Sequence, residues 1–161
     1  MDRHQWETEL VACYARVLRA LIVLARNREH GEDAFHDALT AALAPGVVDG
    51  IRRADAWLFV VGVRGLQKSR WKARLELPLR ALRSTAPPPT TERVEVVELL
   101  AQLAPRQREI VIARFYLDLT YEQIAESFGI SVGTATATVS QALARLRKTA
   151  KGGAAWTSAK S

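Results

Sequence analysis

The spacing of apolar residues predicts that the chain opens with an amphipathic helix. Between residues 5 and 27, apolar side chains recur at steps of three or four, so they fall on one face of a helix. The predicted buried stripe consists of Trp6, Leu10, Tyr14, Val17, Leu21 and Leu24. We expect this stripe of the first helix to form part of the hydrophobic core.

A second helix is expected after His30-Gly31, a pair that breaks the first pattern, and it should end near Ala44-Pro45-Gly46. Glu32 and Asp33 would then place negative charge in its first turn, where the helix dipole favours acidic residues. Its expected inward residues are Phe35, Ala38, Leu39 and Ala42. By helical spacing, the opposite face carries Asp33, His36, Asp37 and Thr40. This pattern predicts an exposed acidic stripe.

A third helix is predicted from about Ala54 to Glu76. Its expected packing residues, the small ones allowing close approach, are Trp57, Leu58, Val61, Gly62, Gly65, Leu66 and Ser69. Residues 51–75 contain seven Lys or Arg and one acidic residue, Asp55, and so carry the whole formal net charge of +6. The cations are Arg52, Arg53, Arg64, Lys68, Arg70, Lys72 and Arg74.

Clustering of these cations favours a surface that binds a polyanion, because contacts to phosphates release counterions. A solvated basic helix face is the alternative. Aromatic side chains beside such a surface can stack on unpaired bases. We take Trp71 as the stacking candidate and assign Trp57, which lies in the apolar part of the helix, to the core.

The three consecutive prolines at residues 87–89 predict a semi-rigid linker between two domains, because proline removes amide donors and favours extended backbone. The expected fold class is all-α, with two small helical domains joined by this Pro-rich linker. The expected boundaries are 1–76 for the first domain, 77–92 for the linker, 93–150 for the second domain and 151–161 for a flexible tail rich in Gly, Ala and Ser.

After the linker, apolar residues at steps of three predict a helix over 91–103, and Pro105 fits the first turn of the next helix. The apolar residues of the first of these helices are Val94, Val97, Leu100 and Leu103, which we expect to pack under Ile110, Val111 and Phe115.

Residues 120–148 read as two helices joined by a tight turn. Thr120 and Gln123 form a capping-box pattern, Gly129 suits the left-handed position past a helix end, and Ser131 can cap the second helix. The stripe of the second helix that should be buried is Ala135, Val139, Ala142 and Leu146. The opposite stripe, small and polar rather than charged, is Gly133, Thr136, Ala137, Ser140, Gln141 and Ala144.

Such a face suits a helix that enters a DNA major groove, where hydroxyl and amide groups meet base edges. An ordinary helical hairpin with a glycine turn is the alternative. The candidate DNA contacts in this helix-turn-helix are Ser131, Gly133, Thr134, Thr136, Ala137, Ser140, Gln141 and Arg145.

Four segments follow one another at a characteristic spacing: Leu103-Ala-Pro-Arg-Gln-Arg-Glu-Ile-Val, Leu119-Thr-Tyr-Glu-Gln-Ile-Ala-Glu, Ile130-Ser-Val-Gly-Thr and Ala142-Leu-Ala-Arg-Leu-Arg. Together, over residues 93–148, they resemble region four of bacterial RNA polymerase sigma factors, in the small extracytoplasmic-function group. This resemblance implies that the helix-turn-helix reads the minus-thirty-five promoter element. Thr136 and Gln141 stand where basic residues are common, so we expect a weaker salt dependence of DNA binding.

Glu32-Asp-Ala-Phe-His-Asp-Ala-Leu is similar to the part of sigma region two that docks on the clamp helices of the polymerase, with His36 where glutamine is usual. The resemblance implies that the polymerase core is bound by Asp33, His36, Asp37 and Thr40. The imidazole of His36 keeps a hydrogen-bonding group at this position.

Ala56-Trp-Leu-Phe-Val-Val-Gly-Val-Arg-Gly-Leu is similar to the part of sigma region two that melts the minus-ten element and captures an unpaired base. Val63-Arg64 replaces the usual Arg-Asn, and Lys68 replaces a usual Asp. The minus-ten contacts that the resemblance implies are Arg64, Lys68, Arg70, Trp71, Lys72 and Arg74.

The function expected is that of a promoter-specificity subunit, with the polymerase core (clamp helices and flap), promoter DNA and an anti-sigma factor as partners. Two alternatives remain open. A sigma-like decoy or adaptor would bind polymerase or a regulator without initiating transcription, and a helix-turn-helix repressor would bind palindromic operators as a dimer. The linker resembles the family's in place and length, which implies a path through the polymerase, and a mere spacer is the alternative.

Catalysis and cofactor binding find no support, since phosphate loops, nucleophile elbows and metal motifs are missing from the sequence. His30, Glu32, Asp33 and His36 form a poor metal cluster, because nothing elsewhere supplies a matching ligand set. Cys13 is the single cysteine and favours a buried thiol over a redox sensor. The apolar stretch 10–25 is too short and too charged for a membrane span, which favours residence in the cytoplasm.

Overall fold

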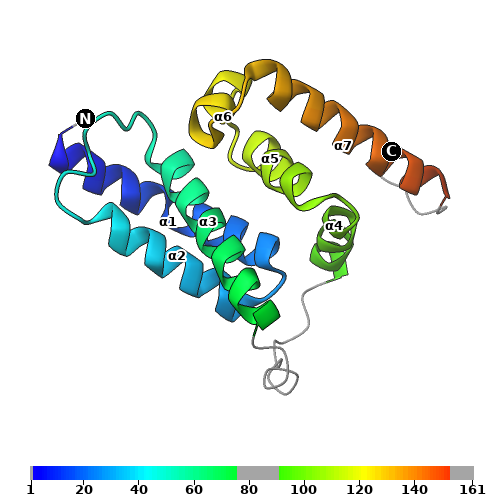
Figure 1. The fold of residues 1–161 in the computed structure, drawn as a ribbon, viewed down its shortest axis with the longest axis horizontal. Helices are drawn as coiled ribbons and strands as arrows, with labels where there is room; N and C mark the ends of the chain where they lie inside the picture. The colour runs from blue at the N-terminus through cyan, green and yellow to red at the C-terminus, as the bar shows by residue number, and fades with distance from the viewer. Residues whose placement is uncertain (1, 76–90, 153–161) are drawn as a thin grey trace. The chain divides into compact units, whose positions relative to one another are not determined.

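The computed structural model describes residues 2–75 and 91–152, and within these ranges every regular element is an α-helix. The predicted all-α fold class is therefore confirmed. The helices are α1 (Arg3–Ala25), α2 (Arg28–Ala42), α3 (Ala54–Leu75), α4 (Thr91–Ala101), α5 (Pro105–Phe115), α6 (Tyr121–Phe128) and α7 (Val132–Gly152) (Figure 1). The chain divides into two compact units, residues 1–88 and 89–161. The prolines of the predicted linker and most of the predicted tail fall outside the described ranges.

The first unit is a bundle in which α1, α2 and α3 each pack on the other two (Figure 1). Its largest fully buried side chains are Trp6, Leu21, Phe35, Leu58 and Phe59. The predicted stripe of α1 is buried except for Tyr14, which is 38% exposed and was wrongly assigned to the core. The indole Nε1 of Trp6 donates to the carbonyl of Ala42 at 2.9 Å, so the start of α1 is held to the end of α2.

The start of α2 differs from the prediction. Arg26 adopts a left-handed conformation (φ 54°) that ends α1, and the Asn27 side chain caps α2 by accepting from the backbone N–H of His30 at 2.9 Å. His30-Gly31 therefore lies inside the helix, and Glu29 occupies the first turn. A Cβ at position 31 would lie 2.5 Å from the Cα of Ile22, so Gly31 marks a close contact between helices.

The third helix begins at Ala54 as predicted and extends to Leu75. Gly62 permits close packing, because a Cβ there would collide with the Leu21 side chain, whereas Gly65 meets only an ordinary contact at 3.8 Å. Trp57 is half-buried and meets the edge of Trp6 with ring centroids 5.9 Å apart. Its expected place in the core is borne out in part.

The second unit is built on α5, α6 and α7, which contact one another (Figure 1). Leu103, Val111 and Ala142 form a buried cluster against which Leu100 and Leu146 pack. Pro105 occupies the first position of α5, as predicted. Phe115 is 59% exposed and not the packing partner that was predicted, because it lies at the last position of α5, beyond the buried run of residues 109–113. Among the described helices, none combines the length and the apolar character that a membrane span requires.

Candidate nucleic-acid interface

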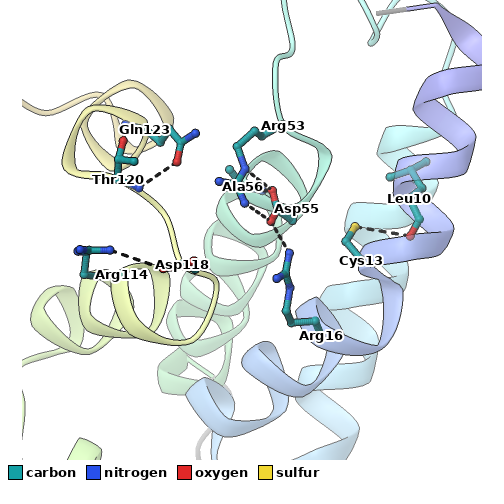
Figure 2. Close-up of polar contacts among 10 residues, drawn as sticks. All are labelled: Leu10, Cys13, Arg16, Arg53, Asp55, Ala56, Arg114, Asp118, Thr120 and Gln123. Carbon is teal, nitrogen blue, oxygen red and sulfur yellow. Dashed lines mark hydrogen bonds and ion pairs between the residues drawn. The ribbon is translucent and has the colours of Figure 1, made fainter.

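The turn between α6 and α7 has the geometry that the sequence predicts. Thr120 Oγ1 accepts from the backbone N–H of Gln123 at 3.2 Å, and Gln123 Oε1 accepts from the backbone N–H of Thr120 at 2.9 Å (Figure 2). Gly129 ends α6 in the left-handed region (φ 65°, ψ 40°). Ser131 Oγ then accepts from the backbone N–H of Thr134 at 3.0 Å and caps α7. Local residues thus fix both helix ends.

Two arginines of α5 brace this motif, and sequence patterns gave no signal for either. Arg106 lies over the Phe128 ring at 4.8 Å, donates to the Phe128 carbonyl at 3.4 Å and pairs with the buried Glu109 at 3.3 Å. Arg114 lies over the Tyr121 ring at 5.2 Å and donates to the Leu119 carbonyl at 3.2 Å. Both ends of α6 are therefore fastened to α5.

The two predicted stripes of helix α7 face the core and the solvent as expected. Ala135, Val139 and Ala142 are buried and Leu146 is half-buried. All eight candidate DNA contacts are exposed: Ser131, Gly133, Thr134, Thr136, Ala137, Ser140, Gln141 and Arg145. The helix carries no ionisable side chain from Val132 to Ala144. Its described cations, Arg145, Arg147 and Lys148, are exposed and lie toward its C-terminal end.

The basic segment of the first unit separates into outward and tethered side chains. Arg64, Lys68 and Lys72 are exposed and follow one another at steps of four, so they form one column along α3. Arg70 instead donates from Nη2 to the carbonyl of Leu24 at 3.2 Å, which ties the C-terminal part of α3 to the end of α1. The side chains of Trp71 and Arg74 lie outside the described part of the structure, so their predicted roles stay predictions.

A buried carboxylate organises the other end of α3. Asp55 is 5% exposed and accepts from Arg53 at both oxygens (3.0 and 2.6 Å) and from Arg16 of α1 at 2.7 Å (Figure 2). Its Oδ1 also accepts from the backbone N–H of Ala56 at 2.8 Å, so it caps α3. Arg53 is therefore engaged by an acid, and the cations most available for phosphate contacts are those of the column.

Cys13 lies near this cluster on α1 and is buried, as predicted. Its Sγ donates to the carbonyl of Leu10 at 3.5 Å (Figure 2). Burial, followed by the negative charge of Asp55, raises the pKa of the thiol from 9.0 to about 11. The sulfur therefore stays protonated and unreactive at neutral pH.

The predicted acidic stripe on α2 is exposed at every position: Asp33, His36, Asp37 and Thr40. Beside it lies a shallow apolar groove of about 220 Å³ between α1 and α2, lined by Glu7, Leu10, Val11, Tyr14, Leu39 and Leu43. Val11 and Leu43 are 78% and 48% exposed. This groove was not predicted, because Tyr14 and Leu39 were expected in the core. The available signal in the sequence was Val11, an apolar residue that lies next to Leu10 and outside the predicted buried stripe.

Residues 93–146 match the sequence family described as sigma-70, region 4. Over 141 residues the chain is 33% identical to the RNA polymerase sigma-E factor of Streptomyces avermitilis, a match that covers 82% of this chain and 77% of that protein.

Two solved structures share the fold. The first is the sigma factor RpoE of Bartonella quintana, in complex with the anti-sigma factor NepR. It superposes with a TM-score of 0.75 at 24% identity, covering 91% of this chain and 97% of that one. The second is CnrH, in complex with the cytosolic domain of CnrY. It superposes with a TM-score of 0.70 at 19% identity, covering 94% of this chain and 90% of that one.

Proposed function

Because the chain belongs to the bacterial RNA polymerase sigma factors, in their extracytoplasmic-function group, we propose that its two compact units act on different parts of a promoter. The protein directs RNA polymerase to initiate transcription. The observation that carries the proposed division of labour is chemical. The outward face of α3 is a column of cations, whereas the outward face of α7 is uncharged over its first three turns.

In this proposal the first unit holds the opened minus-ten element. Arg64, Lys68 and Lys72 contact the backbone of the displaced strand, since cations along a groove track single-stranded phosphates. Trp71 and Arg74 remain minus-ten contacts that the family resemblance implies. We assign Arg70 a positioning role, because its guanidinium is bound to the Leu24 carbonyl.

The second unit reads the closed minus-thirty-five element through α7. Its helix-turn-helix geometry supports this assignment, because the second helix of such a motif enters the major groove with its N-terminal residues at the base edges. The eight exposed residues named above for α7 are the proposed contacts. Arg145, with Arg147 and Lys148, lies where the helix leaves the groove and can meet phosphates.

The polymerase core is the proposed partner of α2. The acidic stripe supplies carboxylates for basic residues of the clamp helices, and the adjoining apolar groove supplies buried area. The flap of the polymerase is a further proposed contact that the family likeness implies. An anti-sigma factor is a further proposed partner, since the RpoE of Bartonella quintana was solved with one. These roles are regulatory rather than catalytic, and they place the protein in the cytoplasm with the polymerase.

The test is transcription by core polymerase plus this protein on fragmented genomic DNA, with sequencing of the transcripts. We expect start sites that share two upstream elements. Lys68→Ala should reduce open complexes about tenfold, an order-of-magnitude figure for one lost charged contact. Arg19→Ala, which removes an exposed cation from α1, is the matched control and should leave them unchanged.

The same experiment separates the alternatives. A decoy or adaptor would retain core polymerase in a pull-down and yield no shared promoter elements. A repressor would select palindromic DNA without polymerase. Equal effects of Lys68→Ala and Arg19→Ala would contradict the proposed role of the α3 column.

A further inference from the structure

Two threonine hydroxyl groups on α7 have a fixed hydrogen-bond direction, because each donates its proton to the helix backbone. Thr136 Oγ1 donates to the carbonyl of Val132 at 2.9 Å, and Thr138 Oγ1 donates to the carbonyl of Thr134 at 2.7 Å. A hydroxyl has one proton and two lone pairs. While its proton is held by the helix backbone, exposed Thr136 presents only acceptor lone pairs and a methyl group to whatever lies outside.

Neighbours on the same face add two further groups. Ala137 is exposed and offers a methyl group, and Gln141, one turn on, is exposed and offers an amide. Since residues 132–144 hold no ionisable side chain, this part of the face lacks the arginine or lysine that commonly binds guanine O6 and N7. The outward chemistry is therefore acceptor, methyl and amide.

These groups match one kind of base pair. In the major groove, adenine offers an N6 donor beside an N7 acceptor, thymine offers a methyl group, cytosine offers an N4 donor, and guanine offers acceptors alone. An acceptor on Thr136 can pair with an amino donor and is repelled by guanine. The Gln141 amide can bind adenine N6 and N7 together, and the Ala137 methyl can contact the thymine methyl. A G·C pair can offer the cytosine N4 donor to Thr136, but only an A·T pair also offers the adenine N6 and N7 edge and the thymine methyl group, so A·T pairs alone satisfy all three.

We propose that α7 selects A·T base pairs in the minus-thirty-five element, with Thr136, Ala137 and Gln141 as the specificity-determining residues. This inference rests on the proposed function, because it takes α7 to enter the major groove. It goes further by naming the base edges that are read and the direction of each hydrogen bond.

The first test uses duplex libraries that are randomised across the upstream element. The polymerase holoenzyme that contains this chain selects from these libraries the sequences that it binds. We expect enrichment of A·T over G·C by about tenfold at the base pairs that face the three residues. Thr136→Val keeps the shape and the methyl group and removes the acceptor, so it should cut this discrimination about fivefold at one position. Thr149→Val is the matched control.

That control removes the same type of bond, because Thr149 Oγ1 donates to the carbonyl of Arg145 at 3.2 Å. Thr149 is half-buried and lies on the inner side of α7 by helical spacing. Its substitution should leave base selection unchanged. Circular dichroism of both variants checks that the helix is retained.

A second test isolates the methyl contact in the DNA. Replacing thymine by uracil in the selected duplex deletes one methyl group and leaves all base-edge hydrogen-bonding groups in place. Affinity of the holoenzyme should fall about threefold to fourfold, the value of one buried methyl. In Ala137→Gly, the thymine and uracil duplexes should bind equally, a comparison made within one variant.

Gln141→Arg provides a gain of specificity, because arginine binds guanine bidentately. We expect guanine to replace adenine at one enriched position. Two results would overturn this inference if promoter-dependent transcription persists. One is enrichment of G·C by the unmodified protein, and the other is base selection that is unaltered in Thr136→Val and Gln141→Arg. Loss of all sequence selection together with absent promoter-dependent transcription overturns the proposed function as well.

Discussion

At the scale of single residues, Asp55 joins parts of the first unit that are distant in sequence. Its buried carboxylate receives hydrogen bonds from Arg16 on α1, from Arg53 and from the first turn of α3. Asp55→Asn keeps the volume and the capping oxygen but removes the charge that both arginines face. We expect it to lower the free energy of unfolding by about 2 kcal/mol, the range for charged hydrogen bonds. Urea unfolding followed by tryptophan fluorescence measures it, since Trp6 and Trp57 lie in this unit.

Glu7→Gln is the control for this prediction, because the Arg3–Glu7 pair is solvent-exposed, with side chains 46% and 51% accessible. Exposed pairs contribute less than about 1 kcal/mol. If both substitutions destabilised the unit equally, Asp55 would not hold the special position that its burial indicates.

The thiol of Cys13 predicts a pH dependence at high pH. Its pKa is about 11 in the folded chain against an ordinary value of 9.0. Above pH 9.0 the unfolded thiol loses its proton first, so folded-state stability that is present below pH 9.0 declines as pH rises toward about 11. The decline attributable to this group is up to about 2 kcal/mol. The free energy of unfolding, measured at several pH values across this window, should fall less with pH for Cys13→Ala than for the unmodified chain.

A chemical readout accompanies that comparison. An aromatic disulfide reagent should modify Cys13 slowly at about pH 8 in the folded protein and rapidly in urea, because the thiolate is the reactive form. Equal rates in the two states would mean that the sulfur is neither buried nor protonated as described.

At the scale of the elements, two glycines of the helix-turn-helix should respond oppositely to alanine. Gly129 has a positive φ of 65° and open space where a Cβ would stand, so alanine there meets only backbone strain and should destabilise α6 and α7 by about 1 kcal/mol. Gly133 lies in the first turn of α7, where an added Cβ would lie 3.8 Å from Ser131 Oγ. Gly133→Ala should stabilise the free protein by about 0.5 kcal/mol.

Native-state hydrogen exchange of the α6 and α7 amides separates these two effects, since it reports stability unit by unit. Stabilisation by Gly129→Ala would contradict the left-handed turn. Protection lost in Gly133→Ala would indicate a contact at that position other than open solvent.

Helix ends were predictable where the signal is local and failed where it depends on packing. The Thr120–Gln123 capping box, the Gly129 turn and the Ser131 cap each rest on residues within a few positions of one another. The predicted helix break at His30-Gly31 was wrong, because a glycine beside a polar residue usually marks such a break. Here Gly31 fills a close contact with Ile22, a neighbour on another helix that no local pattern reveals.

The candidate sites show the same limit. Exposure of the α7 stripe and of the α2 acidic stripe followed from helical spacing alone. The tether of Arg70 to Leu24 and the groove beside Leu43 required two helices to be placed together. Composition could show that residues 51–75 are basic, but not which cations face outward.

At the scale of the whole molecule, the proposed function gives the two units different kinds of recognition. The formal charge of +6 belongs to residues 51–75, and the remaining residues sum to zero. Most of the affinity that depends on counterion release should therefore reside in the first unit, with a smaller share from the cations at the end of α7, and affinity that depends on base identity should reside in the second unit. This separation predicts that salt and sequence sensitivity can be removed independently.

Two combined variants test that separation in the holoenzyme on one promoter. Arg64→Ala, Lys68→Ala and Lys72→Ala together should reduce the slope of log affinity against log salt by about 2, since each single-strand phosphate contact contributes about 0.7. Thr136→Val with Gln141→Leu should weaken promoter binding by a factor that is the same at every salt concentration, because neither substitution alters charge. Binding titrations at several salt concentrations give both slopes. A reduced slope in the α7 variant would mean that Thr136 or Gln141 contributes to phosphate contacts, and the assignment of these two residues to base readout would then be wrong.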